Sequence, residues 1–270
     1  MRWNGNKSKH IQHIKKYIPE YNRYIEPFVG SGALFLWLQP SSWIINDINK
    51  DAINVWKRVK SSLDDILSRI KQFGKRFVLL QKDGKVAMCK LYTSRIPTLP
   101  YNADRATIYL LMKFCAYYGN ILIRDKFYFN GFEPSMNTTA LPYFMSLRYF
   151  KLLHKVSAFL NSGKGKIYNK DYRFILRKTT RGDFVFLDPP YLEKHDYRFN
   201  YNIGESLENS FLTELLEEVK KLDKKGVKWL MTQADTAEVK STFRGYKIIK
   251  FPVYSAYSSS RKYELIIKNY

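Results

Sequence analysis

Four consecutive residues, Asp188-Pro189-Pro190-Tyr191, combine a carboxylate, a rigid proline pair and an aromatic ring. The carboxylate can accept a hydrogen bond from an amine, and the Pro189 carbonyl can accept a second one. The ring of Tyr191 can stack on a planar group. The tetrapeptide therefore suits a ligand that is a planar base with an exocyclic amine. Because Asp-Pro is also common in turns, an ordinary strand-to-turn exit is the alternative.

The residues before the tetrapeptide predict the element that positions it. Residues 184–187 form a short apolar run that ends at Asp188 and the prolines, which is typical of a buried strand. In open α/β sheets, ligands bind at the carboxyl ends of the strands. This is where the predicted strand places Asp188.

A glycine-containing turn, Phe28-Val29-Gly30-Ser31-Gly32, is the second candidate for ligand binding. It lies between a strand predicted over residues 24–28 and a helix predicted over 33–38. Glycine lets a backbone approach a ligand closely, and a helix N-terminus offers N–H groups. The turn has only two of the three glycines of the dinucleotide fingerprint, so a tight turn without a ligand is equally compatible with it. The missing glycine also disfavours a hydride-transferring dehydrogenase.

Asp47 ends the next predicted strand, over residues 43–47. An acidic residue at this point can hold ribose hydroxyls. It could equally cap the helix predicted over residues 49–60. The order of the three features is nevertheless the order that one nucleotide-binding sheet requires.

Charge is the strongest signal in the composition. The 270 residues include 46 Lys and Arg but 24 Asp and Glu, a formal net charge of +22. This surplus predicts a polyanionic partner, and nucleic acid is favoured over a membrane because no basic amphipathic helix stands out. Aromatic residues, at 16%, suit base stacking among cations. A lysine-rich solubilising surface is the competing interpretation.

No apolar run approaches the roughly 18 residues of a transmembrane helix, and the N-terminus lacks the apolar stretch of a signal peptide. Cys89 and Cys115 lie in apolar surroundings, which predicts buried free thiols. We therefore expect a cytoplasmic or nucleoid-associated protein, or one located wherever viral or plasmid DNA resides, and not a secreted one. His10 and His13 are three apart, but no Cys or carboxylate cluster completes a metal site, so no metal is expected.

Alternating strands and helices predict an α/β sheet. The alternation occupies residues 1–60 and 164–270, and helical stretches dominate residues 61–163. We therefore expect one discontinuous α/β domain with a helical insert of small-domain size.

Together these motifs resemble those of the Dam-like (D12 class) adenine-N6 DNA methyltransferases. Residues 27–32 are similar to the family's S-adenosylmethionine motif, and 188–191 match its catalytic tetrapeptide. Thr232-Gln233-Ala234-Asp235 departs from a more usual Ser-Asn-x-Asp. The remaining matched positions are Trp3, Lys7, Asp47, residues 169–172 and residues 260–265.

The resemblance implies a Rossmann-like methyltransferase sheet with helices on both faces, plus an inserted, mainly helical target-recognition domain. It implies transfer of a methyl group from S-adenosyl-L-methionine to the N6 amine of adenine in a specific sequence of double-stranded DNA, in a setting such as restriction–modification. The cofactor-binding residues that it implies are Trp3, Lys7, Phe28, Gly30, Gly32, Asp47, Asp171 and Asp188.

In that reaction, the catalytic residues Asp188, Pro189, Pro190 and Tyr191 would hold the amine and the base. Two acceptors on the amine stabilise the positive charge that grows on its nitrogen. The amine is reachable only after base flipping, with Tyr191 on one face of the base. The nucleic-acid contacts that we expect are Phe199 or Tyr201 on the other face, with Asn120, Arg124, Lys126 and Asn130 of the insert.

Two other classes of function compete with this one. The same chemistry could act on cytosine N4, RNA adenine or a protein glutamine, although Asp188 resembles the adenine enzymes more than the Ser that is usual in cytosine-N4 enzymes. A non-catalytic DNA-binding subunit could keep the fold, although every recognisable motif position is filled.

Overall fold

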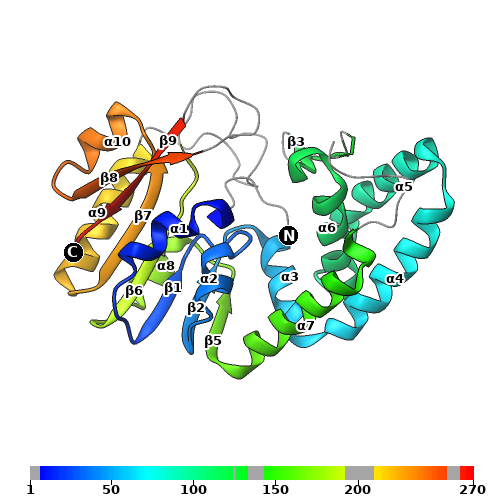
Figure 1. Ribbon diagram of the computed structural model, residues 1–270, viewed down its shortest axis with the longest axis horizontal. Helices are drawn as coiled ribbons and strands as arrows, with labels where there is room; N and C mark the ends of the chain where they lie inside the picture. Colours follow the sequence, from blue (N-terminus) through cyan, green and yellow to red (C-terminus); the bar gives the residue numbers. More distant parts are fainter. Residues whose placement is uncertain (1–6, 124–125, 130, 133–142, 192–209, 254–261) are drawn as a thin grey trace. The chain divides into compact units, whose positions relative to one another are not determined.

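A computed structural model describes residues 7–123, 126–129, 131–132, 143–191, 210–253 and 262–270 (Figure 1). These residues divide into two compact units. The sheet unit comprises residues 7–48 and the described residues from 164 to 270, and the helical unit comprises those from 49 to 163. Each is described by itself.

The sheet unit contains a seven-stranded sheet, whose order is β5-β2-β1-β6-β7-β9-β8. All neighbours pair in parallel except β9, which is antiparallel to both β7 and β8. The predicted α/β class is confirmed. The strands are β1 (Arg23–Glu26), β2 (Ser42–Asn46), β5 (Lys164–Tyr168), β6 (Asp183–Leu187), β7 (Lys228–Ala234), β8 (Lys247–Val253) and β9 (Lys262–Lys268).

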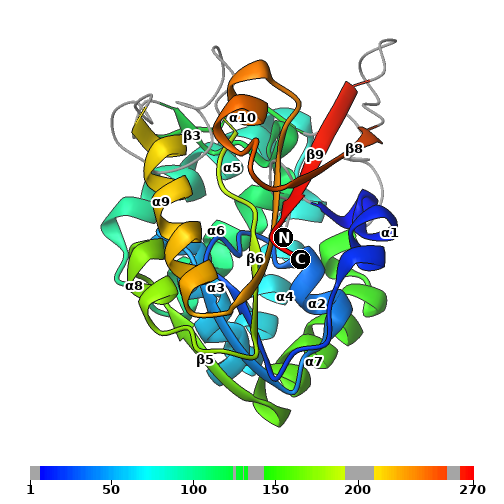
Figure 2. The same ribbon diagram turned by 90° about the vertical axis from the view of Figure 1, so that its left-hand side faces the viewer.

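Helices cover both faces of this sheet, as expected (Figures 1 and 2). On one face α8 (Tyr172–Arg177), α9 (Ser210–Lys224) and α10 (Ala237–Thr242) pack on an apolar cluster that includes Ile25, Val185 and Met231. On the other face α2 (Ala33–Leu38) packs through Phe35, whose ring lies 6.1 Å from that of Tyr24. Because both faces of the sheet are covered, β1 and β6 show almost no alternation between polar and apolar residues.

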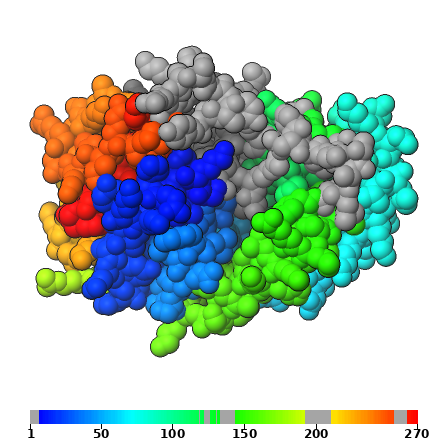
Figure 3. Space-filling view, viewed as in Figure 1, coloured from blue at the N-terminus to red at the C-terminus, as the bar shows by residue number. Residues whose placement is uncertain are grey.

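Ile11, Ile14 and Ile18 fall at helical spacing and predict one helix over residues 8–18, but the chain reaches this second face through three short helical turns instead. They are η1 (Lys7–Lys9), α1 (Ile11–Ile14) and η2 (Lys15–Tyr17). His10 and His13 pack their rings on Phe251 of β8, at centroid distances of 5.7 and 5.4 Å. The blue N-terminal segment therefore lies beside the orange and red C-terminal strands in Figure 3.

The helical unit is built around α6 (Ala103–Cys115), most of whose residues are buried. Arg105 of α6 forms a buried ion pair with Asp51, at 2.6 Å, in α3. Cys89 and Cys115 are buried free thiols, as predicted. The other elements of the unit are α3 (Lys50–Ser61), α4 (Leu63–Leu79), α5 (Lys82–Arg95), η3 (Ile96–Thr98), η4 (Tyr117–Gly119), β3 (Leu122–Ile123), β4 (Lys126–Phe127), η5 (Tyr143–Met145) and α7 (Leu147–Ser162).

Two local features differ from expectation. The helical unit begins at Asn49, not at residue 61, because α3 packs against α6 and α7. The sequence Ser62-Leu63-Asp64-Asp65 is a capping-box signal that predicts the start of a helix, and Ser62 does precede α4, but its side chain makes no capping hydrogen bond. None of the described helices combines the length and apolar character needed to cross a membrane.

Candidate functional site

Asp188 directly follows β6, at the carboxyl edge of the sheet. Its side chain is 19% exposed, so Asp188 is largely buried but is not sealed in the interior. The strand before it is buried throughout, which holds the backbone of Asp188 in place. The predicted strand and its carboxyl-end acid are therefore both found where the sequence places them.

Two side chains bind the same oxygen of Asp188. The Thr232 hydroxyl, from β7, donates a hydrogen bond to Oδ1 over 2.7 Å. The Lys7 ammonium, from η1, lies 3.0 Å from Oδ1. Because both contacts use Oδ1, this oxygen of the carboxylate is anchored by two elements of the sheet unit. Thr232 is fully buried and Lys7 is 4% exposed, so both anchors are fixed by packing.

The same lysine connects Asp188 to Tyr191. The Lys7 ammonium lies 4.5 Å from the centroid of the Tyr191 ring and 3.7 Å from the Glu264 carboxylate. The Tyr191 hydroxyl donates to Glu264 Oε2 over 2.8 Å. The ring is thus fixed at its hydroxyl end and contacted by a cation. Glu264, from β9, belongs to the matched segment 260–265, but the sequence analysis gave it no role at the site, because its partner is distant in the chain.

These contacts set the charge of the site. Burial raises the pKa of Asp188, and the charge of Glu264 adds to the rise, whereas Lys7 and the Thr232 hydroxyl oppose it. The net pKa is higher than that of an ordinary aspartate. Burial and the neighbouring charges of Asp188 and Glu264 also raise the pKa of Tyr191, so its hydroxyl stays protonated and can donate to Glu264.

The glycine turn has the backbone that its residue types predict. Gly30 and Gly32 have φ values of 44° and 65°, in the left-handed region that favours glycine. The Asp47 carboxylate accepts a hydrogen bond from the Gly30 N–H over 2.8 Å, which joins the turn to the end of β2. The helix after β2 is capped by Asn49, whose side chain accepts from the Ala52 N–H. The alternative interpretation of Asp47 as that helix cap is therefore wrong.

Glu26, the last residue of β1, is a buried acid that sequence reasoning missed. Its carboxylate accepts a hydrogen bond from the buried Tyr24 hydroxyl over 2.9 Å. Burial raises its pKa well above the ordinary value, and the charges of Asp188 and Asp47 raise it further. Acidic side chains thus end three neighbouring strands. The sequence signal that could have identified Glu26 is the presence of an acid two residues before the glycine turn.

Asp171 and Phe28 lie at the same edge of the sheet unit. Asp171 caps α8 by accepting from the Arg173 N–H over 2.9 Å, and it also pairs with the Arg173 guanidinium. Burial alone would raise its pKa, but the bonds from Arg173 outweigh burial and lower it. Phe28 packs its ring against that of Tyr172, at 5.1 Å. Its side chain is half-buried.

The predicted nucleic-acid contacts are only partly described. In the helical unit, Asn120 follows η4 and is half-buried, and Lys126 of β4 is exposed. The predicted site residues that lie outside the described residues are Trp3, Arg124, Asn130, Phe199 and Tyr201. No group of His, Cys, Asp and Glu that could hold a metal ion occurs within the described ranges.

The sheet order, the glycine turn and the strand-end acids define a Rossmann-like α/β enzyme domain. A family model described as D12 class N6 adenine-specific DNA methyltransferase matches residues 3–253. The chain belongs to this family, and it is an enzyme that methylates the N6 amine of adenine in DNA. This conclusion confirms the resemblance drawn from the sequence.

Three relatives illustrate the similarity. The Type II methyltransferase M1.LlaDCHI of Lactococcus lactis subsp. cremoris is 26% identical, over 100% of this chain and 94% of its own length. The Type II methyltransferase M.MjaIII of Methanocaldococcus jannaschii is 25% identical, over 100% of this chain and 98% of its own. The DNA N-6-adenine-methyltransferase of Escherichia phage P1 is 24% identical over 97% of this chain, which spans 33% of that longer protein.

Proposed function

We propose that the chain transfers the methyl group of S-adenosyl-L-methionine to an adenine that has been flipped out of double-stranded DNA, and that the carboxyl edge of the sheet unit is where this occurs. The observation that carries the proposal is the anchoring of Asp188: Lys7 and Thr232 both hold Oδ1. A surface carboxylate held this firmly is suited to orienting one hydrogen-bond donor of a substrate.

The chemistry of the edge fits a cationic nucleoside. Glu26, Asp47 and Asp188 lie at the ends of neighbouring strands, and the charges of Asp47 and Asp188 raise the pKa of Glu26, as expected of an acidic edge that favours a cation. The backbone around Gly30 and Gly32 is in a conformation that permits close approach of a ligand. A sulfonium donor supplies an activated methyl group to such a site. Asp47 and Asp171 would hold its ribose and adenine, with Trp3, Lys7 and Phe28 as further contacts.

The amine of the substrate would be held by two acceptors. Asp188 accepts one N–H, and the carbonyl of Pro189, which lies buried directly after it, accepts the other. The two acceptors favour a pyramidal nitrogen and stabilise the positive charge that develops during attack. Pro190 keeps the segment rigid because its φ is locked by the ring. The proton that remains on nitrogen can leave after methyl transfer, so Asp188 needs no elevated basicity.

Tyr191 would stack on the extruded base. Its hydroxyl is hydrogen-bonded to Glu264 and its ring is contacted by Lys7, so the Tyr191 side chain loses little conformational entropy when a base binds. The opposite face of the base would be covered by Phe199 or Tyr201. The net charge of +22 supports binding to the phosphate backbone, with a strong dependence of affinity on salt.

The helical unit would read the target sequence. It is a compact unit of its own, and it contains the exposed Lys126 in the short hairpin β3–β4. Asn120, Arg124 and Asn130 would contribute from the same stretch of chain. Side chains on this hairpin would reach base edges while cations elsewhere on the unit bind phosphates.

The experiment compares wild-type protein, Asp188→Asn and the exposed control Glu217→Gln on unmethylated genomic DNA and on RNA, with isotopically labelled donor. Nucleosides from the digested products are separated by mass spectrometry. We expect labelled N6-methyladenine from DNA with the wild type and the control, and at least a hundredfold less with Asp188→Asn. N4-methylcytosine, labelled RNA alone, or DNA binding without any product would each refute the proposal.

A further inference from the structure

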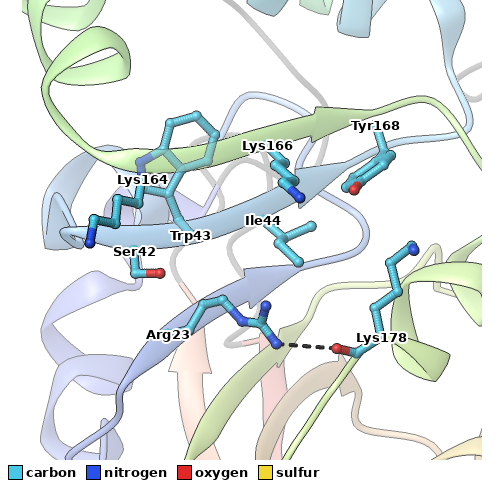
Figure 4. Close-up of a pocket in the computed structure, with 8 residues that line it drawn as sticks. All are labelled: Arg23, Ser42, Trp43, Ile44, Lys164, Lys166, Tyr168 and Lys178. Atoms are coloured by element: carbon cyan, nitrogen blue, oxygen red, sulfur yellow. Dashed lines mark hydrogen bonds between the residues drawn. The ribbon is translucent and has the colours of Figure 1, made fainter.

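The sheet unit has a second recess that is lined by none of the residues placed in the methyl-transfer site. It has a volume of about 350 Å³ and lies over β1, β2 and β5. Figure 4 shows Lys164 and Ser42 at one end of it and Tyr168 and Lys178 at the other. Concave sites of this size are typical of small-molecule binding.

Strand register explains how the recess forms. Lys164, Lys166 and Tyr168 alternate along β5 and therefore project from one face, opposite Ser42 and Ile44 of the paired strand β2. Lysines on an edge strand also discourage strand pairing with other molecules. Protection against strand pairing would require charged side chains only on the edge strand β5.

Cations also line the recess from two other elements. Arg23 comes from the start of β1, and Lys178 follows α8. The Arg23 guanidinium donates to the Lys178 carbonyl over 3.1 Å, which joins the two elements on the side opposite β5 (Figure 4). Positive side chains therefore surround the recess instead of forming a single row.

The recess carries a net positive charge. Arg23 is balanced by the buried Asp183, at 2.6 Å. No carboxylate of the described residues lies within ion-pair distance of Lys164, Lys166 or Lys178, and none lines the recess. Three uncompensated ammonium groups around one small volume favour a ligand with several negative charges.

The composition of the lining changes along the recess. The buried Ile44 forms an apolar floor, and the ring of Tyr168 lies at one end, 5.9 Å from the Lys178 ammonium. Lys166 and Arg23 lie nearer the middle (Figure 4). A lining that combines an aromatic ring and an apolar floor with several ammonium groups suits a molecule that has both a planar ring and phosphates.

We propose that this recess binds a nucleoside di- or triphosphate, with its ring against Tyr168 and Ile44 and its phosphates against Lys164 and Lys166. A DNA duplex is a less suitable occupant. Its phosphates contact cationic side chains that protrude from a protein surface, and they make no contact with an apolar floor. The proposal concerns binding alone and does not depend on methyl transfer.

The test measures binding of ATP, GTP, inorganic triphosphate and a short DNA duplex to the full chain by calorimetry. Saturating S-adenosylhomocysteine is present so that adenine nucleotides are kept from the donor site, and GTP provides a measurement that is independent of that precaution. The variants are the double change Lys164→Gln with Lys166→Gln, the single change Tyr168→Leu, and Lys228→Gln. Lys228 is an exposed lysine at the start of β7 in the same unit, and it serves as the matched control.

We expect one nucleotide per chain, with affinity reduced at least tenfold by the double change and less than twofold by Lys228→Gln. Tyr168→Leu should weaken the binding of nucleotides but not of inorganic triphosphate. Unchanged nucleotide affinity in the double variant, or several weak and equal sites, would overturn the proposal. A loss of duplex binding while nucleotides bind as before would identify the DNA backbone as the occupant and would also overturn it. Unchanged melting temperatures establish that the variants are folded.

Discussion

Replacement of Thr232 by valine tests whether the anchoring of Asp188 matters for catalysis. Valine keeps the shape of the buried side chain but removes the hydroxyl that donates to Asp188 Oδ1 over 2.7 Å. A hydrogen bond to a charged group contributes about 1.5–3 kcal/mol. The carboxylate keeps Lys7 as a partner and is partly exposed, so we expect the lower end of that range. About 1.4 kcal/mol corresponds to tenfold in rate.

We therefore expect kcat/KM at pH 8 to fall about tenfold in Thr232→Val. The bond also opposes the rise of the Asp188 pKa on burial, so its loss should move the acid limb of the pH–rate profile to higher pH. The assay is incorporation of labelled methyl groups into DNA from pH 5 to 9. Thr232→Ser, which keeps the hydroxyl, should restore most of the rate.

Thr179→Val is the matched control, because Thr179 is equally buried in the sheet unit and donates to the Leu176 carbonyl away from the site. It should leave the rate and the profile unchanged. The reasoning is refuted if Thr232→Val keeps the wild-type rate and acid limb, or if Thr232→Ser loses as much activity as Thr232→Val.

Three further predictions concern charge and packing. In Lys7→Met the loss of the cation that lowers the pKa of Asp188 should move the acid limb upward, measured as kcat/KM for DNA at saturating donor. The raised pKa of Glu26 means that the folded state holds its proton longer than the unfolded state, so wild-type stability should fall as pH rises above the ordinary value of 4.5, and Glu26→Gln should flatten this fall in thermal melts. In Gly165→Ala the new Cβ would lie 2.0 Å from the buried Trp43 ring, which should reduce the free energy of unfolding by about 1–3 kcal/mol in urea titrations.

Each of these predictions has its own control. Lys9→Met removes a neighbouring exposed lysine and should not move the acid limb. Parallel melting curves of wild type and Glu26→Gln across pH would contradict the assignment of that slope to Glu26. Gly245→Ala places its Cβ in open space and should cost little, so an equal loss in both glycine variants would show that the indole contact is not the cause.

Most of the sheet could be predicted because its signals are local. The apolar runs before Asp188 and Asp47, each followed by a polar residue, correspond to β6 and β2. The helix after the glycine turn begins at Ala33 and ends at Leu38, as the apolar run and Pro40 predict. These elements need only hydrophobic periodicity and turn chemistry.

The parts that could not be predicted depend on contacts between distant residues. Residues 8–18 contain isoleucines at helical spacing, but His10 and His13 pack on Phe251 and the segment forms three short turns. Asp47 and Asn49 are both capable caps, and only the geometry at the start of α3 selects Asn49. The position of Thr232 beside Asp188 depends on the register between β6 and β7, which no local pattern encodes.

The pairing of Lys7 with Asp188 and Glu264 joins the first described turn to the last strand around one carboxylate. Such contacts are among the latest to form in a growing polypeptide, because β9 must be synthesised and inserted between β7 and β8 first. A chain still emerging from the ribosome therefore has the glycine turn and Asp188 but lacks the support for Tyr191. The support that Lys7 and Glu264 give to Tyr191 would therefore be complete only after β9 has been synthesised.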